Sequence, residues 1–256
     1  MKLSIITVTF NSSKTISDTI SSVLKQNYEN YEYIIVDGGS RDNTVDIIKE
    51  FEPKFNGKMR WISEKDKGMY DGINKGIKMA TGDVVGIINS DDFYHRDDIF
   101  QIINDSFVSN PESQAIYGDV RFVHPGCLNK TVRYYSSRNF KPWKFRWGWM
   151  PAHPTFFTYK ENFKKYGYYK YDYHIAADFE LLTRFLYSNR LSTIYIPIDF
   201  MKMRTGGRST NGFNANIVLN REIVRACKEN GIYTCMPMLF LKYFIKVFEL
   251  VFTKNK

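Results

Sequence analysis

Apolar and polar positions along the first hundred residues form two kinds of alternating segment. Short apolar runs rich in β-branched residues predict strands over 3–9, 33–36, 59–62 and 84–88. Between and after them, apolar residues recur at helical spacing over 14–26, 45–51, 69–79 and 99–108. Strands that are apolar throughout and alternate with helices indicate a parallel sheet covered on both faces. Such sheets bind ligands at the carboxyl ends of their strands.

The pattern changes in the second half of the chain. Residues 115–160 are rich in aromatic and basic residues and are interrupted by prolines, which predicts short strands and loops in a mixed sheet. Further on, the spacing predicts a helix over 176–187, a strand over 192–196 and a helix over 214–230. No repeat or low-complexity linker separates these parts.

Composition places the chain among folded globular proteins. Charged residues form 25% of its 256 residues and hydrophobic residues 43%, which excludes disordered and coiled-coil classes. Lysine and arginine outnumber acidic residues, 36 to 27, so the net charge of +9 favours an anionic partner: nucleic acid, nucleoside diphosphate or acidic lipid. The three cysteines lack metal-binding spacing. The first apolar stretch is too short for a signal peptide, so we expect a cytoplasmic location.

Acidic residues stand directly after the fourth predicted strand, in the segment 89–92, Asn-Ser-Asp-Asp. Two adjacent carboxylates repel each other unless a cation lies between them, and Mg²⁺ or Mn²⁺ with phosphate oxygens meets that need. The alternative is a helix N-cap, because aspartate is favoured before the helix that follows. The residue types alone leave both interpretations open.

Other polar turns follow the neighbouring strands. Asp37 begins an Asp-Gly-Gly turn, and Asp66 begins an Asp-Lys-Gly turn just before the helix that carries Asn74. Each alone is typical of an ordinary turn. Together they predict a polar site at one edge of the sheet.

These four segments, taken in order, resemble glycosyltransferase family 2 with the GT-A fold. The resemblance rests on 7–11, 36–40, 66–76 and 89–92, and continues in 151–155 and 177–181, so it spans about residues 1 to 210. Within the family, the chain is most similar to bacterial enzymes that build O-antigen or capsular polysaccharide. The resemblance implies an α/β fold with a Rossmann-like, mostly parallel central sheet, a mixed acceptor half and C-terminal helices. It implies a catalytic domain over 1–212, with a nucleotide-binding half 1–125 and an acceptor half 126–212, and a helical extension over 213–256.

The resemblance also implies roles for single residues. Thr9 and Asp37 would hold the nucleotide base, with Asp66 and Asn74 at the nucleotide and sugar. Asp91 would contact the ribose or donor sugar, Asp92 would bind the metal, and Asp178 would be the catalytic base, which implies inversion at the anomeric carbon. Ala177 stands where the family usually has an acidic residue, so Glu180 and Asp172 remain alternatives for the base.

Three further residues are candidates for contacts to the diphosphate or the acceptor: His153, Glu180 and Arg208. A packed loop histidine is an equal alternative for His153. Arg208 stands in a Gly-rich loop over 205–210, which suits closure over a diphosphate and equally an ordinary surface loop.

We therefore expect a Mg²⁺- or Mn²⁺-dependent inverting glycosyltransferase. It would move a sugar from a nucleoside-diphosphate sugar to a saccharide or lipid-linked saccharide in cell-surface polysaccharide synthesis. The alternatives are a sugar nucleotidyltransferase and a basic nucleic-acid-binding protein. Sugar nucleotidyltransferases carry a glycine-rich, basic loop after their first strand, and this chain lacks one. It also has no recognisable nucleic-acid-binding module.

The C-terminal segment 236–252 is apolar except for Lys242, Lys246 and Glu249, which fall on one helical face. It is too short and too charged to span a bilayer. We expect it to lie at the inner face of the cytoplasmic membrane, on anionic headgroups. The alternative is a helix that packs on the catalytic body or on another subunit.

Overall fold

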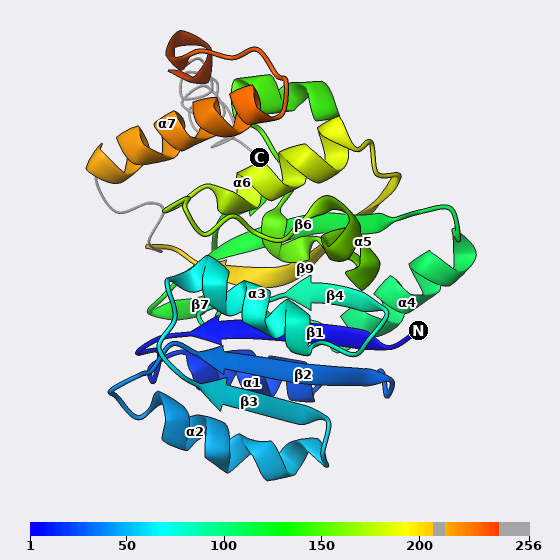
Figure 1. Cartoon of the computed structure of the whole chain (residues 1–256). Helices are drawn as coiled ribbons and strands as arrows, with labels where there is room; N and C mark the ends of the chain where they lie inside the picture. The colour runs from blue at the N-terminus through cyan, green and yellow to red at the C-terminus, as the bar shows by residue number, and fades with distance from the viewer. Residues whose placement is uncertain (207–212, 241–256) are drawn as a thin grey trace.

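The computed structural model describes residues 1–206 and 213–240, and in this part the chain folds around one twisted sheet (Figure 1). The strands lie in the order β3-β2-β1-β4-β8-β6-β9-β5, and β7 pairs with β6 off this path. Their bounds are β1 Leu3–Thr9, β2 Tyr31–Asp37, β3 Met59–Ser63, β4 Val84–Ile87, β5 Phe93–Tyr94, β6 Ala115–His124, β7 Cys127–Tyr135, β8 Phe157–Tyr159 and β9 Thr193–Arg204.

Helices cover both faces of this sheet. Their bounds are α1 Ile16–Leu24, α2 Thr44–Phe51, α3 Met69–Met79, α4 Ile99–Ser109, α5 Lys160–Tyr166, α6 Ala177–Thr183 and α7 Phe213–Glu229. Short helical turns occupy Glu52–Phe55, Pro142–Trp147, His153–Thr155 and, directly after α6, Arg184–Ser188. Buried apolar residues of α3, α5, α6 and α7 form one core cluster, and those of α1, α2 and α4 form another. These two clusters are the apolar layers on the two faces of the sheet.

The strands of the first half are parallel, as their continuous apolar character predicts. β1 pairs in parallel with β2 and β4, and β2 pairs in parallel with β3. All seven residues of β1 and of β2 are buried. In this register Thr9 lies opposite Asp37, and Asp37 lies opposite Ser63, so the carboxyl ends of three strands meet at one edge.

A buried carboxylate holds the opposite edge of these strands. Glu32 accepts hydrogen bonds from the Ser4 hydroxyl at 2.6 Å, the Gly82 amide at 3.1 Å and the Arg60 guanidinium at 2.7 Å. Burial by itself raises the pKa of Glu32, but these bonds and those from Thr81 lower it to about 2. The ionised carboxylate therefore stabilises the fold far from the polar edge.

The second half extends the sheet with antiparallel pairs, which agrees with the predicted mixed sheet. β8 pairs antiparallel with both β4 and β6, while β6 and β9 are parallel. The predicted strand over 192–196 is too short, since β9 continues to Arg204. Pro197 lies where the β6–β9 register shifts, between the pairs Tyr117–Tyr195 and Asp119–Asp199. This irregularity accommodates a residue that has no amide hydrogen, and the strand resumes beyond it.

The described C-terminal part packs on the same body. Ile223, Ala226 and Cys227 of α7 belong to the core cluster of α3 and α6. Residues 236–240 are helical, and the rest of the predicted helix over 236–252 lies outside the described residues. Within 1–206 and 213–240, no helix has the length and apolar character needed to cross a membrane.

Candidate functional site

The turn after β2 is shaped by the carboxylate of Asp37. Its Oδ2 accepts hydrogen bonds from the Gly39 amide at 3.1 Å, the Ser40 amide at 2.9 Å and the Ser63 hydroxyl at 2.6 Å. The side chain is fully buried. Asp37 therefore ties the end of β3 to the turn after β2 and fixes the backbone of that turn.

A buried hydroxyl lies beside this turn. Thr9 is 4% exposed, and its Oγ1 finds no hydrogen-bond partner among the described residues. Its carbonyl oxygen accepts from the Gly38 amide at 2.9 Å, which brings the ends of β1 and β2 together. Because an unpaired buried hydroxyl costs free energy, this position is suited to a bound polar group.

Two glycines make room for the carboxylate of Asp66. A Cβ atom at Gly38 would lie 2.8 Å from Asp66 Oδ2, and a Cβ at Gly72 would lie 3.2 Å from the same oxygen and 2.8 Å from Val8 Cγ1. Asp66 Oδ1 accepts a hydrogen bond from the Gly68 amide at 2.9 Å. The carboxylate is thus seated between the β2 turn and the first turns of α3, near Thr9.

The paired carboxylates follow β4. Asp91 and Asp92 lead into β5, and α4 begins only at Ile99, so the helix N-cap alternative is wrong. Asp92 is 1% exposed and accepts a hydrogen bond from the Asn89 side-chain amide at 2.9 Å. Burial raises the pKa of both carboxyls, and the charge of Asp91 raises that of Asp92 further.

Arg204, at the end of β9, reaches this acidic pair. Its guanidinium donates to the Asp91 carbonyl oxygen, forms an ion pair with Asp18 and lies 5.1 Å from the centre of the Phe93 ring. Its charge lowers the pKa of Asp91 and of Asp92, although burial outweighs it. Arg204 was not among the site residues predicted from the sequence. The available signal was its place directly before the Gly-rich loop over 205–210.

The acidic pair can offer two carboxylates to a metal ion. Within 1–206 and 213–240, no three His, Cys, Asp or Glu side chains gather as a cluster able to hold one. Two carboxylates are a donor set that fits a hard divalent cation whose other ligands are water and phosphate oxygens. The loops of β1 and β4 meet here, since Ser12 and Ser90 share a hydrogen bond of 2.9 Å and the Thr19 hydroxyl donates to the Asp92 carbonyl at 2.7 Å.

Asp178 lies in the first turn of α6 and is partly exposed. Its carboxylate accepts a hydrogen bond from the Phe179 amide at 2.7 Å. Burial raises the pKa of Asp178 to about 6, and the charge of Glu222 on α7 adds to this rise. A carboxyl with such a pKa is ionised at neutral pH and basic enough to take a proton.

Two tyrosines adjoin Asp178. Tyr70 and Tyr169 are stacked with ring centres 5.9 Å apart, and the charge of Asp178 contributes to raising the pKa of both, after burial. The Tyr70 hydroxyl donates to the carbonyl oxygen of Ile175, just before α6. Tyr70 stands in the same helical turn of α3 as Gly72, which packs against Asp66. That turn therefore connects the strand-end carboxylates to Asp178.

His153 packs edge-on against the Tyr169 ring, with ring centres 5.7 Å apart. It is 9% exposed, and its Nε2 shares a hydrogen bond of 2.7 Å with the Tyr169 hydroxyl. Burial lowers the pKa of His153 to about 4, so the ring is neutral at physiological pH. The packed-histidine alternative agrees with this placement, which supports the position of Tyr169.

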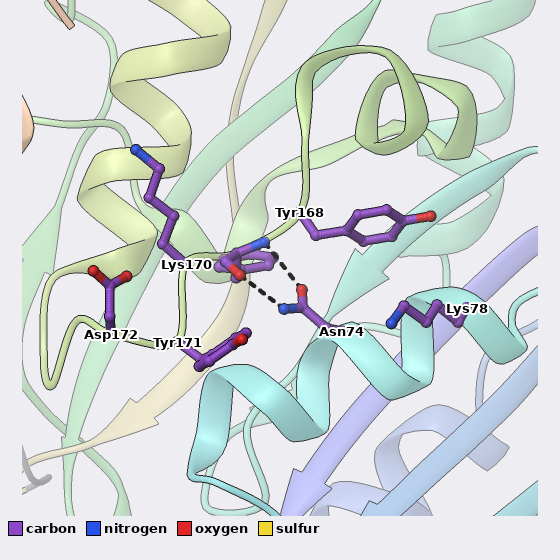
Figure 2. Close-up of a pocket in the computed structure, with 7 residues that line it drawn as sticks. Asn74, Lys78, Tyr168, Lys170, Tyr171 and Asp172 are labelled. Carbon is purple, nitrogen blue, oxygen red and sulfur yellow. Dashed lines mark hydrogen bonds between the residues drawn. The ribbon is translucent and has the colours of Figure 1, made fainter. Parts of the chain in front are cut away.

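Asn74 lies on α3, facing the segment that leads toward α6 (Figure 2). Its amide nitrogen donates to the Tyr169 carbonyl at 2.7 Å, and its amide oxygen accepts from the Tyr169 amide at 3.0 Å. Both polar atoms of the side chain are therefore engaged with backbone. Beside them lies a pocket of about 460 Å³. Its other lining residues are Lys78, Tyr168, Lys170, Tyr171 and Asp172.

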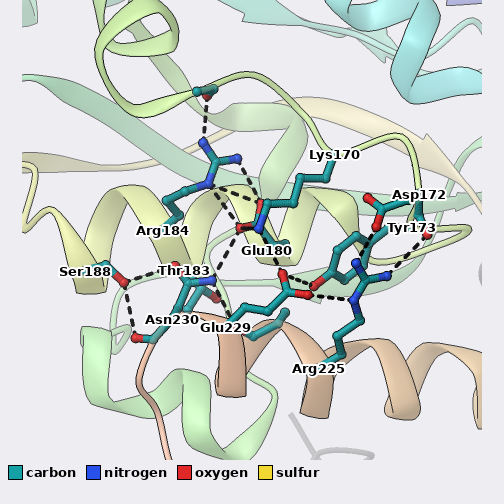
Figure 3. A network of polar contacts seen from close by, with 12 residues as sticks. Lys170, Asp172, Tyr173, Glu180, Thr183, Arg184, Ser188, Arg225, Glu229 and Asn230 are labelled. Atoms are coloured by element: carbon teal, nitrogen blue, oxygen red, sulfur yellow. Dashed lines mark hydrogen bonds and ion pairs between the residues drawn. The ribbon is translucent and has the colours of Figure 1, made fainter.

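The alternatives to Asp178 are held in ion pairs (Figure 3). Glu180 is fully buried and pairs with Lys170 at 3.0 Å and with Arg184 at 2.9 Å. Asp172 is exposed and pairs with Arg225. This arrangement favours a structural role for Glu180 over the contact with diphosphate or acceptor predicted from the sequence. Arg208 lies outside the described residues.

Comparisons with known proteins agree with this geometry. Residues 4–176 match the family model described as Glycosyl transferase family 2. The PGL/p-HBAD biosynthesis glycosyltransferase of Mycobacterium bovis (strain BCG / Pasteur 1173P2) is 28% identical over 202 residues, covering 76% of this chain and 73% of the relative. The Poly-beta-1,6-N-acetyl-D-glucosamine synthase of Staphylococcus epidermidis is 37% identical over 138 residues, which is 52% of this chain and 33% of that protein.

Solved structures share the fold. S. aureus TarS 1-349 in complex with UDP-GlcNAc superposes with a TM-score of 0.64 at 19% identity, covering 91% of this chain and 68% of that one. The mannosyltransferase PcManGT from Pyrobaculum calidifontis, in complex with GDP-Man and Mn²⁺, superposes with a TM-score of 0.59 at 16% identity. The match covers 97% of this chain and 80% of that one. The match covers only 40% of the longer TarS chain. These likenesses confirm the predicted α/β fold of the GT-A type.

Proposed function

The chain belongs to glycosyl transferase family 2 and is a glycosyltransferase, and from this premise we propose the reaction that its site performs. It moves a sugar from a nucleoside-diphosphate sugar to a hydroxyl group of a saccharide acceptor, with inversion at the anomeric carbon. The observation that carries this proposal is the first part of α3, where Gly72 packs on Asp66 and Tyr70 holds the segment before Asp178. A donor-side carboxylate and a basic carboxylate are thereby joined through one helix.

The donor side is the edge formed by β1, β2 and β4. We propose that Thr9, whose hydroxyl has no partner among the described residues, and the carboxylate of Asp66 contact the nucleoside, and that Asp37 fixes the turn between them. We propose that Asp91 contacts the ribose or the donor sugar. TarS and PcManGT, which share the fold, are solved with UDP-GlcNAc and GDP-Man respectively. That supports a nucleotide-sugar donor for this chain.

The proposed chemistry is a single displacement. The acceptor oxygen forms a bond to the anomeric carbon while the bond from that carbon to the diphosphate oxygen breaks. The electron pair of the broken bond leaves with the nucleoside diphosphate. Asp178 takes the proton of the acceptor hydroxyl, and its pKa of about 6 suits this task at neutral pH. One base on one face gives inversion.

A divalent ion fits the acidic pair. We propose that Asp92, with Asp91 beside it, holds Mg²⁺ or Mn²⁺. Burial raises the pKa of both carboxyls, and the charge of Asp91 raises that of Asp92 further, so a bound cation would favour their ionised form. When bound, the ion would neutralise the charge of the leaving diphosphate. The sharing of this fold with a protein solved with Mn²⁺ supports the assignment.

The acceptor we propose is a saccharide, carried on a lipid, in cell-surface polysaccharide synthesis. The relatives named for PGL/p-HBAD biosynthesis and for a poly-N-acetylglucosamine synthase support this class. The apolar segment 236–252 would then bring the enzyme to anionic lipid. A variant that ends at Gly231 should lose binding to vesicles containing anionic lipid while still binding donor. Equal binding of the full chain and the shortened chain would refute the membrane role.

The reaction is tested by incubating the protein with nucleotide sugars, Mn²⁺ and saccharide acceptors. We expect release of a nucleoside diphosphate and a glycosylated acceptor, without pyrophosphate. Pyrophosphate release from a nucleoside triphosphate and a sugar phosphate would instead identify a nucleotidyltransferase. A donor present at 100 times its dissociation constant should stabilise the fold by about 2.7 kcal/mol, which identifies the preferred nucleotide by thermal unfolding.

A further inference from the structure

A carboxylate on α7 forms hydrogen bonds with the backbone that leads into α6. Glu222 accepts hydrogen bonds from three consecutive amides: His174 at 2.6 Å, Ile175 at 2.9 Å and Ala176 at 2.8 Å. Its side chain is buried, with the residue 8% exposed. Three charge-assisted bonds to successive amides fix the course of this segment more firmly than contacts between side chains would.

The same segment is held from the other side by α3. The Tyr70 hydroxyl donates to the carbonyl oxygen of Ile175, while the amide of that residue donates to Glu222. One residue is thus bonded through both of its backbone groups to two helices that are far apart in the sequence. Asp178 follows three residues later, in the first turn of α6.

The start of α6 is not fixed by the side chain of its own N-cap residue. The N-cap residue of α6 is Ala176, and it makes no side-chain cap hydrogen bond. Alanine is a poor N-cap, so the start of so short a helix needs another anchor. Glu222 anchors this start from a different helix, by bonding the amides of the three residues that precede α6 and not the free amides of its first turn.

We propose that Glu222 is a positioning residue for Asp178: from α7 it holds residues 174–176 and so sets the place of the helical turn that carries the base. The inference rests on the proposed function, since it gives Glu222 a task in that reaction. Through Glu222, α7 would then contribute to catalysis by positioning Asp178, in addition to covering the sheet. Glu222 itself touches neither donor nor acceptor in this role.

Electrostatics supports the same assignment. The charge of Glu222 raises the pKa of Asp178, in addition to burial. The other groups near Asp178 are uncharged at neutral pH: Tyr70 and Tyr169 have pKa values well above the ordinary value, and His153, bonded to Tyr169, has one of about 4. On α6 itself, Glu180 is paired with Arg184. Among the described residues, Glu222 is therefore the charge that acts on this carboxyl.

Glu229 provides a matched control on the same helix. Its carboxylate accepts hydrogen bonds from Lys170 at 2.8 Å, Tyr173 at 2.9 Å and Arg225 at 2.7 Å (Figure 3). All three partners are side chains, and none belongs to residues 174–176. Replacing Glu229 removes a network of similar size without removing a hydrogen bond to residues 174–176.

The test compares Glu222→Gln with Glu229→Gln in the full chain, by steady-state transfer at several pH values. For Glu222→Gln we expect kcat to fall by about 10- to 100-fold with the donor KM within about twofold, because the base is displaced and donor binding is not. The acidic limb of the pH profile should move to lower pH, since a negative charge near Asp178 is gone. For Glu229→Gln we expect the acidic limb of the pH profile to stay in place and kcat to remain close to that of the wild type.

Glu222→Asp keeps the negative charge on a side chain that is shorter by one methylene group. This variant tests the positioning role if Glu222→Gln does not fold. It should lower kcat and leave the acidic limb in place. Equal effects of the changes at 222 and 229, or loss of donor affinity in step with kcat, would overturn the positioning role. If the wild-type chain transfers no sugar, or if Asp178→Asn keeps full kcat, the proposed function fails instead, and that result is distinct from failure at Glu222.

Discussion

Replacing Asp178 with asparagine should stabilise the protein at neutral pH while removing its activity. The carboxyl has a pKa of about 6 in the folded protein, against an ordinary value of 3.8. Keeping it ionised therefore costs up to about 3 kcal/mol more in the folded protein than in the unfolded chain. Solvent reaches the partly exposed carboxylate and screens its charge, so we expect a gain of about 1–3 kcal/mol for the neutral amide.

The sign of the effect sets its pH dependence. The folded pKa is raised, so the cost is absent below pH 3.8, grows as the pH rises and is complete above pH 6. The free energy of unfolding of Asp178→Asn should exceed that of the wild type at pH 7.5 and equal it near pH 4. The asparagine oxygen can still accept from the Phe179 amide, so local geometry is kept.

Urea denaturation at the two pH values measures the difference directly. Asp46→Asn is the matched control, because it makes the same chemical change at a carboxylate whose side chain is 78% exposed. Turnover of Asp178→Asn should fall by about 100-fold or more on loss of the general base. If Asp178→Asn is no more stable than the wild type at pH 7.5, or if the gain is the same at both pH values, ionisation of Asp178 does not destabilise the folded protein.

Three further outcomes can be measured on single variants. Asp92→Asn should remove most of the dependence on Mn²⁺ and nearly all transfer without unfolding the protein; full activity in the presence of a chelator would contradict this. Gly38→Ala places a Cβ 2.8 Å from Asp66 Oδ2, so the carboxylate must move, and calorimetry should find donor affinity reduced about tenfold in a chain that unfolds at an unchanged temperature. Glu32→Gln should cost about 3 kcal/mol at pH 7, because the folded pKa of about 2 lies below the ordinary 4.5 and the contribution is complete above pH 4.5. That cost should shrink as the pH falls toward 2, and a cost independent of pH would show that the charge is not its source.

Much of the fold could be predicted because the first half obeys local rules. The predicted helix over 69–79 has the bounds of α3, and the four predicted parallel strands are present. β9 is longer than predicted, and only the pairing with β6 shows that the sheet accommodates Pro197 within it. The helix predicted over 176–187 changes into a wider turn at Arg184–Ser188, which no local spacing reveals.

The strand-end part of the candidate site was predictable for the same reason. Asp37, Asp66 and Asp92 follow predicted parallel strands, and the geometry of such a sheet brings them to one edge. Thr9 ends the first predicted strand and was implied only by the family resemblance. Tyr70 and Glu222 were missed, because their partners before α6 are distant in the sequence and are backbone atoms. In this sequence Glu222 has only the pattern of a charged residue on an amphipathic helix. Its burial and its three amide partners depend on tertiary packing.

The placement of β8 has a consequence for how the chain is made. β8 pairs with β4, and the Phe157 ring lies so close to Gly86 that a Cβ there would be 2.0 Å from ring atom Cε1. During synthesis β4 is made before residues 157–159. Until those residues are made, the edge of β4 that pairs with β8 has no partner strand, and all four residues of β4 are apolar or glycine. An open apolar strand edge recruits other chains. A nascent or proteolysed fragment that stops between β5 and β8 should therefore aggregate. The edge of β4 is covered only after residues 157–159 have been synthesised and paired with it.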